Sequence, residues 1–270
     1  MVYVTGVGDG TVVPMIAKTE EDIKTLREGG RRLARHVSTL IEMVKPGVDV
    51  RDIEKTARDM VAQDGDELAF FGYPSGKRGE KYPTAICLSI NDAIVHGIAS
   101  QTDYILQEGD VVSIDFGIKH KGLYTDHAKT AIAGSPLNAE DEKLVRGTYE
   151  ALSVGIAAAR EGGRTGDIGA AVEAIAKKYG FGFPRDLAGH GVGRALHEDP
   201  HVPNFGTKGT GALLEHHLVI AIEPMMTLGS GLLYVDKDAF TYRTKDGSRA
   251  AHAEHTVIIT PAGAEILTKE

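Results

Sequence analysis

Two stretches of the chain that lie 115 residues apart share one pattern, and this repeat constrains the fold more than any other feature. The segment KPGVDVRDIEKTA at 45–57 aligns with REGGRTGDIGAAV at 160–172, so that Gly47 matches Gly162. Each segment joins one stretch of helically spaced apolar residues to a second such stretch. We interpret the repeat as an internal duplication.

The order of predicted elements is also the same in the two halves. Apolar residues at helical spacing predict helices over 21–44 and from Asp52, and again over 139–159 and from Asp167. Thr19 and Asp22 are candidate caps for the first of these helices. Strand-like segments follow each helix pair, at 84–98, 111–118 and 123–132, and then at 217–227, 232–235, 239–243 and 255–260.

Helices followed by strands, twice over, predict an α+β fold rather than alternating α/β. We expect one catalytic domain over 18–265, with pseudo-halves of about 18–135 and 136–265, preceded by an N-terminal extension, 1–17. A binding site between two such halves is expected at the middle of the molecule.

Composition excludes several classes of protein. With 42% hydrophobic residues and 25% charged residues in 270, the chain is typical of a globular protein rather than a disordered one. Its formal charge of -8 argues against a nucleic-acid-binding protein. The sequence shows no signal peptide or membrane-spanning run, and the single cysteine, Cys87, cannot form an internal disulfide, so we expect a cytoplasmic protein.

The hairpin predicted in the first half carries two aspartates on one face. If the loop is KHKG at 119–122, Asp115 and Asp126 are directly opposite each other, with Cβ atoms about 4.5–5.5 Å apart. Two carboxylates at that distance repel each other unless one is protonated or a cation binds both. The segment therefore predicts either an acid dyad or a metal site, unless both carboxylates are simply solvated.

Three further candidate ligands lie in the second half. His190 lies in the glycine-rich segment LAGHGVGRALHEDPHVP at 187–203, Glu223 interrupts the apolar strand LVIAIEPMM, and Glu254 directly precedes the apolar strand HTVIIT. A glutamate within an apolar strand is costly unless it is paired or coordinated. Four carboxylates and one imidazole form a hard donor set that suits Mn, Fe(II), Co or Zn, and a charge of -4 can neutralise two divalent cations.

These residues stand in motifs that resemble those of the type I methionine aminopeptidases over about residues 18–265. The matching segments are NDAIVHGI (91–98), GDVVSIDFG (109–117), YTDHAKT, GHGVGRALHEDP (189–200), AIEPM (221–225) and AEHTVIIT (253–260). The resemblance implies a pita-bread fold, with pseudo-twofold halves, a central antiparallel sheet and outer helices. It also implies an aminopeptidase that removes the initiator methionine from nascent proteins.

The resemblance further implies a role for each ligand. Asp115 binds one of two divalent metal ions, Asp126 and Glu254 bridge both, and His190 and Glu223 complete the other. Glu223 is also the general base for the attacking water.

Residues at the substrate side follow from the same resemblance. His96 and His197 contact the substrate and its tetrahedral intermediate. Tyr82 and Cys87 align with residues of the methionine pocket. Leu196 and Phe240 fall where related enzymes often have bulkier aromatic side chains, which implies a roomier pocket. SGKRGEKYP at 75–83 looks like a small insertion beside it.

Residues His127 and His252 depart from the family pattern. A small residue is usual where His127 stands, and a glutamine is common where His252 stands. We expect His252 to replace the hydrogen bond of that glutamine. His36, His120, His216 and His217 are expected at the surface.

Three other functions compete with this interpretation. An X-Pro peptidase shares the fold, but we find no creatinase-like N-terminal domain in these 270 residues. A non-catalytic binding protein is expected to have lost ligands, whereas all five are present. An acid dyad leaves His190, Glu223 and Glu254 unexplained. We expect a monomer that acts on the N-terminal Met of nascent peptides, with transient contact to the ribosome, and with no nucleic-acid specificity or membrane partner.

Overall fold

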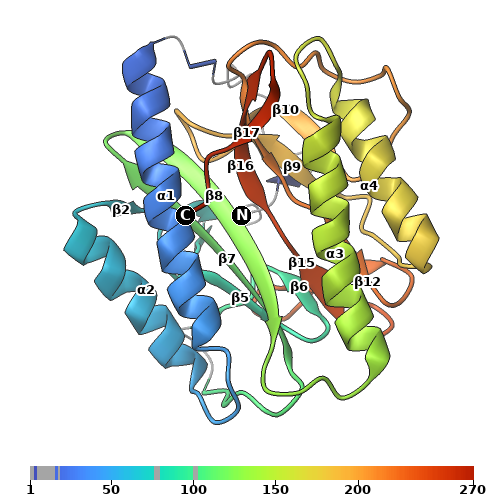
Figure 1. Ribbon diagram of the computed structural model, residues 1–270. Helices are drawn as coiled ribbons and strands as arrows, with labels where there is room; N and C mark the ends of the chain where they lie inside the picture. Colours follow the sequence, from blue (N-terminus) through green and yellow to red (C-terminus); the bar gives the residue numbers. More distant parts are fainter. Residues whose placement is uncertain (1–2, 5–15, 18, 76–79, 100–102) are drawn as a thin grey trace.

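In the part of the chain that the structure describes, four helices form two pairs, one in each half, and each pair packs on an antiparallel sheet. The computed structural model describes residues 3–4, 16–17, 19–75, 80–99 and 103–270. The helices are α1 (Glu20–Glu42), α2 (Val50–Asp64), α3 (Ala139–Ala158) and α4 (Thr165–Tyr179). Figure 1 shows α1 and α2 at the left of the view and α3 and α4 at the right. Within the described residues, none of the helices combines the length and the apolar character needed to cross a membrane.

Capping residues define the helix ends, and one of these caps recurs in both halves of the chain. The Thr19 hydroxyl accepts a hydrogen bond from Asp22 N at 3.0 Å, and the Asp22 carboxylate accepts one from Thr19 N. The two candidate caps thus form a capping box at the start of α1. Helices α2 and α4 end at Gly65 and Gly180, again 115 residues apart, with left-handed φ angles of 70° and 75°. Glycine adopts this conformation at the least cost, so both halves use it to stop the second helix.

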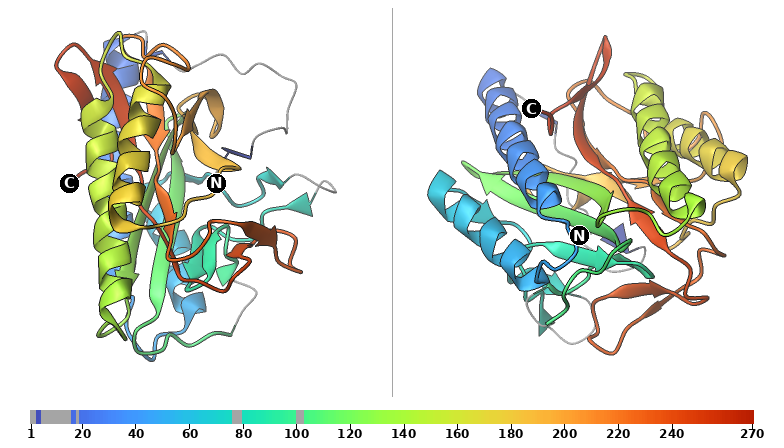
Figure 2. Two further views of the ribbon diagram at one scale, coloured as in Figure 1. Left: turned by 90° about the vertical axis from the view of Figure 1, so that its right-hand side faces the viewer. Right: turned by 60° about the horizontal axis from the view of Figure 1, so that its bottom comes forward.

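The strands that follow each helix pair form two main antiparallel sheets. The first-half sheet has the order β2–β7–β5, with β8 paired to β7; the strands are β2 (Glu67–Leu68), β5 (Cys87–Ile90), β7 (Val111–His120) and β8 (Leu123–Ile132). The second-half sheet has the order β1–β9–β11–β16–β17, with β10 paired to β9; the strands are β1 (Tyr3–Val4), β9 (Leu187–Gly191), β10 (Glu198–Pro203), β11 (Val219–Ile222), β16 (His255–Thr260) and β17 (Gly263–Ile266). Figure 2 shows α3 and α4 stacked against one face of these strands.

Smaller sheets complete the fold, and one of them joins strands from both halves. In that sheet β6 (Ala93–Val95) pairs with β14 (Tyr242–Thr244), which pairs with β13 (Leu233–Val235). Two further pairs are β12 (Met225–Thr227) with β15 (Ala250–His252), and β3 (Pro74–Ser75) with β4 (Glu80–Lys81). Ser75 and the strand β4 belong to the predicted insertion at 75–83, of which residues 76–79 lie outside the described residues.

The register predicted for the β7–β8 hairpin is wrong by two residues. Asp126 lies opposite Gly117 and Asp115 lies opposite Ala128. The turn is the two-residue loop Lys121–Gly122, whose φ angles of 47° and 88° match the positive values that the strand twist favours in tight hairpins. Because a shift of two residues preserves the face of a strand, Asp115 and Asp126 still share one face, as diagonal neighbours.

The two halves meet where β8 lies beside the start of β16. Thr256 accepts a hydrogen bond from Asp126 N at 2.9 Å and donates one to Asp126 O at 2.7 Å. Glu254 N donates to Ala128 O at 2.9 Å. These contacts, between residues about 130 apart in the sequence, hold Asp126 and Glu254 on neighbouring backbones.

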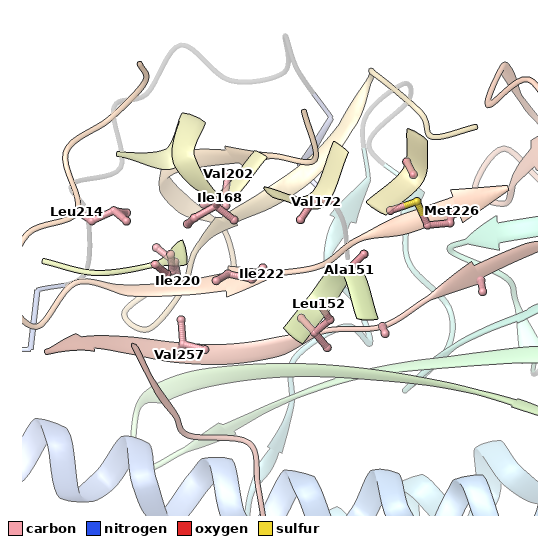
Figure 3. Close-up of a cluster of buried hydrophobic side chains, with 14 of the residues drawn as sticks. Ala151, Leu152, Ile168, Val172, Val202, Leu214, Ile220, Ile222, Met226 and Val257 are labelled. Carbon is pink, nitrogen blue, oxygen red and sulfur yellow. The ribbon is translucent and has the colours of Figure 1, made fainter. Parts of the chain in front are cut away.

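Separate apolar cores support the two halves. In the first half, α1 and α2 pack on β5 and β7 through side chains such as Leu33, Ile53 and Ile114. In the second half, α3 and α4 pack on β11 and β16, as Figure 3 shows for Leu152, Ile168, Val172, Ile220, Ile222 and Val257. The boundaries expected for the N-terminal extension and the pseudo-halves stay a prediction.

His36 and His120 are buried, contrary to their expected surface positions. His36 Nε2 lies 3.0 Å from Asp64 Oδ2, and His120 Nδ1 lies 2.7 Å from Asp66 Oδ1. These two carboxylates compensate for the polar atoms that burial removes from water, which is why the residues can stand where α1, α2 and the hairpin pack together.

A glycine within α1 allows the C-terminal segment to pack closely. A Cβ at Gly30 would lie 2.3 Å from Leu267 O. We therefore predict that Gly30→Ala lowers the free energy of unfolding by about 1–3 kcal/mol, even though alanine is the better helix former by about 1 kcal/mol. Urea unfolding monitored by circular dichroism measures this change. The control is Lys24→Ala, at an exposed position of the same helix. Equal or greater stability of Gly30→Ala contradicts the close approach.

Candidate metal centre

Five acidic and imidazole side chains from both halves converge between the sheets. Asp115 and Asp126 extend from β7 and β8, His190 from β9, Glu223 directly follows β11, and Glu254 directly precedes β16. Each of the five is at most 2% exposed. Ligand atoms of Asp126, His190 and Glu254 all lie within 4.8 Å of one another. Glu223 joins this group through its Oε1, which is 3.5 Å from Nε2 of His190, and the charges of Asp126 and Glu223 act on Asp115. The two aspartates are therefore close to the other predicted donors, although the register that first suggested those two aspartates was wrong.

The orientation of His190 makes it a ready metal ligand. Its Nδ1 lies 2.8 Å from Gly191 O, and because a carbonyl can only accept, Nδ1 carries the proton. The lone pair of Nε2 then faces Glu223, whose Oε1 is 3.5 Å away. Burial lowers the pKa of His190 to about 4, so the ring is neutral at pH 7, as a metal ligand must be.

Glycines on either side of His190 let the neighbouring strands approach it. A Cβ at Gly189 would lie 2.3 Å from Ala221 O, and a Cβ at Gly191 would lie 2.0 Å from Asp199 O. Side chains at these positions would push β10 and β11 away from β9. The glycine framing seen in the sequence thus fixes the depth at which the imidazole lies.

The acids of this cluster do not tolerate ionisation easily without a cation. Burial, together with the charge of Asp126, raises the pKa of Asp115 to about 7. Burial also raises the pKa of Glu223 and of Glu254 well above the usual value, and neighbouring carboxylates add to the effect. In effect, the fold holds carboxylates apart from water and close to one another.

The donor set fits a divalent cation. Oε1 of Glu223 and Oε1 of Glu254 are buried and make no hydrogen bond to any described residue. Native proteins seldom leave buried carboxylate oxygens in this state unless an ion or water satisfies them. Four hard oxygen donors with one imidazole match the preferences of Mn, Fe(II), Co or Zn.

The two histidines predicted to contact substrate lie at one edge of the donor cluster. The ring of His197 stands 4.5 Å from that of His190, edge to face, and its Nδ1 lies 2.7 Å from the hydroxyl of Tyr73. His96 follows β6 with a φ of 59°, a strained value for a non-glycine residue that often marks functional sites. Burial lowers the pKa of both imidazoles well below the usual value.

The residues predicted to form the methionine pocket pack in one apolar cluster. Tyr82, Cys87 and Leu196 are buried there with Ala69, Phe70 and Ile98, and Phe240 packs against them. The rings of Tyr82 and Phe240 are 5.6 Å apart, and Tyr82 also lies 6.3 Å from the ring of His96. Cys87 pairs with Asp115 across the β5–β7 ladder, so the cluster borders the acids directly.

Sequence reasoning missed two residues that support the site. Tyr73, which contacts His197, stands just before the insertion and belongs to none of the matching motifs. Asn204 Nδ2 donates to the backbone oxygen of Glu223 at 3.0 Å. No spacing signal marks either residue, because both contacts join segments that are remote in the sequence.

The site is a buried cluster of carboxylates with one oriented imidazole, built between two duplicated α+β halves. This combination is typical of metal-dependent enzymes. A family model described as metallopeptidase family M24 matches residues 24–261. The chain belongs to this family, and its pita-bread fold and metallopeptidase class agree with the sequence interpretation.

Curated relatives and solved structures resemble nearly the whole chain. A methionine aminopeptidase of Aquifex aeolicus is 42% identical over 255 residues, which cover 93% of this chain and 97% of the relative. A methionine aminopeptidase structure from Thermotoga maritima has a TM-score of 0.89 at 39% identity and covers 95% of this chain and 100% of that one. A prolidase from Pyrococcus furiosus has a TM-score of 0.73 at 25% identity, with coverage of 94% and 66%.

Metal binding at this cluster is predicted to release protons. Asp115 has a pKa of about 7, and a ligand must be deprotonated, so the affinity for Mn²⁺ rises as pH increases through 7. From pH 6 to pH 8, loss of the Asp115 proton alone raises the affinity for Mn²⁺ about tenfold. His190 has a pKa of about 4 and adds nothing to the change in affinity over this pH range.

Isothermal titration calorimetry in buffers of different ionisation enthalpy measures the proton release. The variant Asp115→Asn should bind more weakly and release fewer protons. An Mn²⁺ affinity that is constant between pH 6 and pH 8 contradicts this electrostatic picture of the site.

Proposed function

We propose that the protein is a methionine aminopeptidase that uses two divalent metal ions to remove the N-terminal methionine from peptides. The observation that carries the proposal is the convergence of five buried donors from both halves beside an apolar cluster. The full-length similarity to methionine aminopeptidases supports the choice of substrate.

The apolar cluster has the composition expected of a pocket for a methionine side chain. Tyr82, Cys87, Leu196 and Phe240 offer aromatic, sulfur and aliphatic surface, and thioethers pack well against such groups. Since an apolar pocket discriminates by only about 1–3 kcal/mol per methylene, Leu196 in place of an aromatic residue allows some relaxation of selectivity.

The chain's own residues would orient the substrate and move protons. When bound, divalent cations polarise the scissile carbonyl and make water acidic enough to attack at neutral pH. Asp115, Asp126, His190, Glu223 and Glu254 would hold them. The Glu223 carboxylate accepts the proton of the attacking water and passes it to the leaving amine. His96 and His197 would donate hydrogen bonds to the substrate and to the oxygen that gains negative charge.

The cellular setting belongs to the same proposal. Cys87 is buried as a free thiol, which suits a reducing compartment such as the cytoplasm. There the substrates are nascent chains, and brief contact with the ribosome brings them to a monomeric enzyme. Co-sedimentation with ribosomes and analytical ultracentrifugation test these two points.

The first test is substrate choice. Purified protein supplied with Mn²⁺ or Co²⁺ should release methionine from Met-Ala-Ser, and leave Met-Lys and Ala-Pro peptides intact, because large second side chains are excluded. A peptide panel analysed by mass spectrometry measures this. Cleavage of X-Pro peptides alone would identify an X-Pro peptidase and refute the proposal.

The second test is the ligand assignment. Asp126→Asn keeps the size of the side chain but removes a charged donor from the group formed with His190 and Glu254, so metal uptake and methionine release should fall at least 100-fold. The exposed Asp59 provides a matched control, because Asp59→Asn changes the same chemistry far from the cluster. Elemental analysis and a coupled assay report uptake and turnover. Wild-type activity in Asp126→Asn, with the fold verified by circular dichroism, refutes the assignment.

A further inference from the structure

A sixth side chain, His252 at the end of β15, is directed at the five donors. Its Nε2 lies 3.4 Å from Oε2 of Glu223 and 3.9 Å from Oε2 of Glu254. The imidazole is buried to the same degree as the acids. Two carboxylates therefore lie within 4 Å of a single ring nitrogen.

The hydrogen bonding of His252 differs from that of the other imidazoles near the site. Nδ1 of His190 bonds Gly191 O, Nδ1 of His127 bonds Glu254 O, and Nδ1 of His255 bonds the Thr268 hydroxyl. By contrast, neither ring nitrogen of His252 makes a hydrogen bond to any described residue. A distance of 3.4 Å to Glu223 exceeds the usual range of about 2.7–3.2 Å for such a bond. A buried imidazole in this state needs another partner.

His252 lies at nearly the same distance from Glu223 as the predicted ligand His190. Glu223 has an imidazole Nε2 beside each oxygen, His190 at 3.5 Å from Oε1 and His252 at 3.4 Å from Oε2. Two donor atoms that bind the same ion, each at about 2.0–2.2 Å from it, lie about 3.0–3.5 Å from each other. Both imidazoles therefore stand at the separation that shared coordination with Glu223 requires.

The backbone holds His252 in place through the strands that carry the aspartates. Its N–H is directed at the hydroxyls of Thr130 and Ser113, at 3.1 and 3.3 Å. Its carbonyl accepts a hydrogen bond from the Thr130 hydroxyl at 2.6 Å. Ser113 lies on β7 and Thr130 on β8, so the same hairpin positions Asp115, Asp126 and this imidazole.

We propose that His252 is a sixth metal-binding residue, whose Nε2 binds a divalent cation together with Glu223. This inference rests on the proposed metallopeptidase function but adds a ligand to it. A second imidazole makes the centre richer in nitrogen, and imidazole favours Zn²⁺ and Co²⁺ relative to Mn²⁺. The centre should then discriminate against Mn²⁺ more strongly than one with a single imidazole.

Pulsed electron paramagnetic resonance of the Mn²⁺-loaded protein counts the bound imidazoles. With ¹⁵N-labelled histidine, the wild type should show couplings to two imidazole nitrogens, and His252→Gln should show one. The glutamine variant keeps a side chain that can donate a hydrogen bond to Glu223. It therefore distinguishes binding of the metal by His252 from a role in which His252 only positions Glu223. His201→Gln, which removes a half-buried imidazole outside the cluster, should retain two couplings.

Competition titrations provide an independent measurement. In His252→Gln the ratio of Zn²⁺ affinity to Mn²⁺ affinity should fall about tenfold, and His252→Leu should behave in the same way. Unchanged nitrogen couplings and an unchanged ratio in His252→Gln overturn the inference. If the wild type binds metal and releases methionine with one imidazole bound, only the sixth ligand fails. If the wild type binds no divalent cation, the proposed function fails as well.

Discussion

The mutual repulsion of four buried carboxylates is the constraint on which the rest of the structure depends. Asp115, Asp126, Glu223 and Glu254 are almost fully removed from water, and the pKa of three of them is raised in consequence. A folded chain with this cluster is stable only if protons or cations offset the charge. The formal charge of -8 therefore includes four acids that contribute little to the surface field, so it indicates little about charged partners.

Rigid backbone holds these acids at their positions. Two sheets, each packed on its own helix pair and apolar core, meet along β8 and the start of β16. Because each half supplies part of the cluster, the donors come together only when both halves are folded and joined. Side chains on strands packed in this way have little freedom, which suits a site that must bind ions at fixed distances.

Most of the fold could be predicted from sequence, because it follows from local patterns. Helix bounds agreed within a few residues, since apolar spacing, the capping residues and the terminal glycines act over a few positions. The hairpin register was wrong because a four-residue loop and a two-residue loop both fit the letters KHKG. Only the positive φ angles at Lys121 and Gly122 decide between them.

The four acidic donors were predictable because each lies in or directly beside an apolar strand, where a charge needs a partner, whereas the surrounding glycines suggested His190. Tyr73 and Asn204, in contrast, act through contacts with His197 and Glu223 that no local pattern encodes. His36 and His120 were expected at the surface because their acidic partners are remote in the sequence: Asp64 is the last residue of α2, and Asp66 directly follows the glycine that caps it. Long-range pairing of this kind determines which polar residues can be buried.

Anomalous X-ray diffraction at the metal edge, from crystals grown with Mn²⁺ or Co²⁺, tests the central claim most directly. Two anomalous peaks should appear among Asp115, Asp126, His190, Glu223 and Glu254, each within bonding distance of the assigned oxygen and nitrogen atoms. Crystals of folded protein that show no anomalous peak between these residues at saturating metal would contradict the claim that the carboxylate cluster is a metal centre.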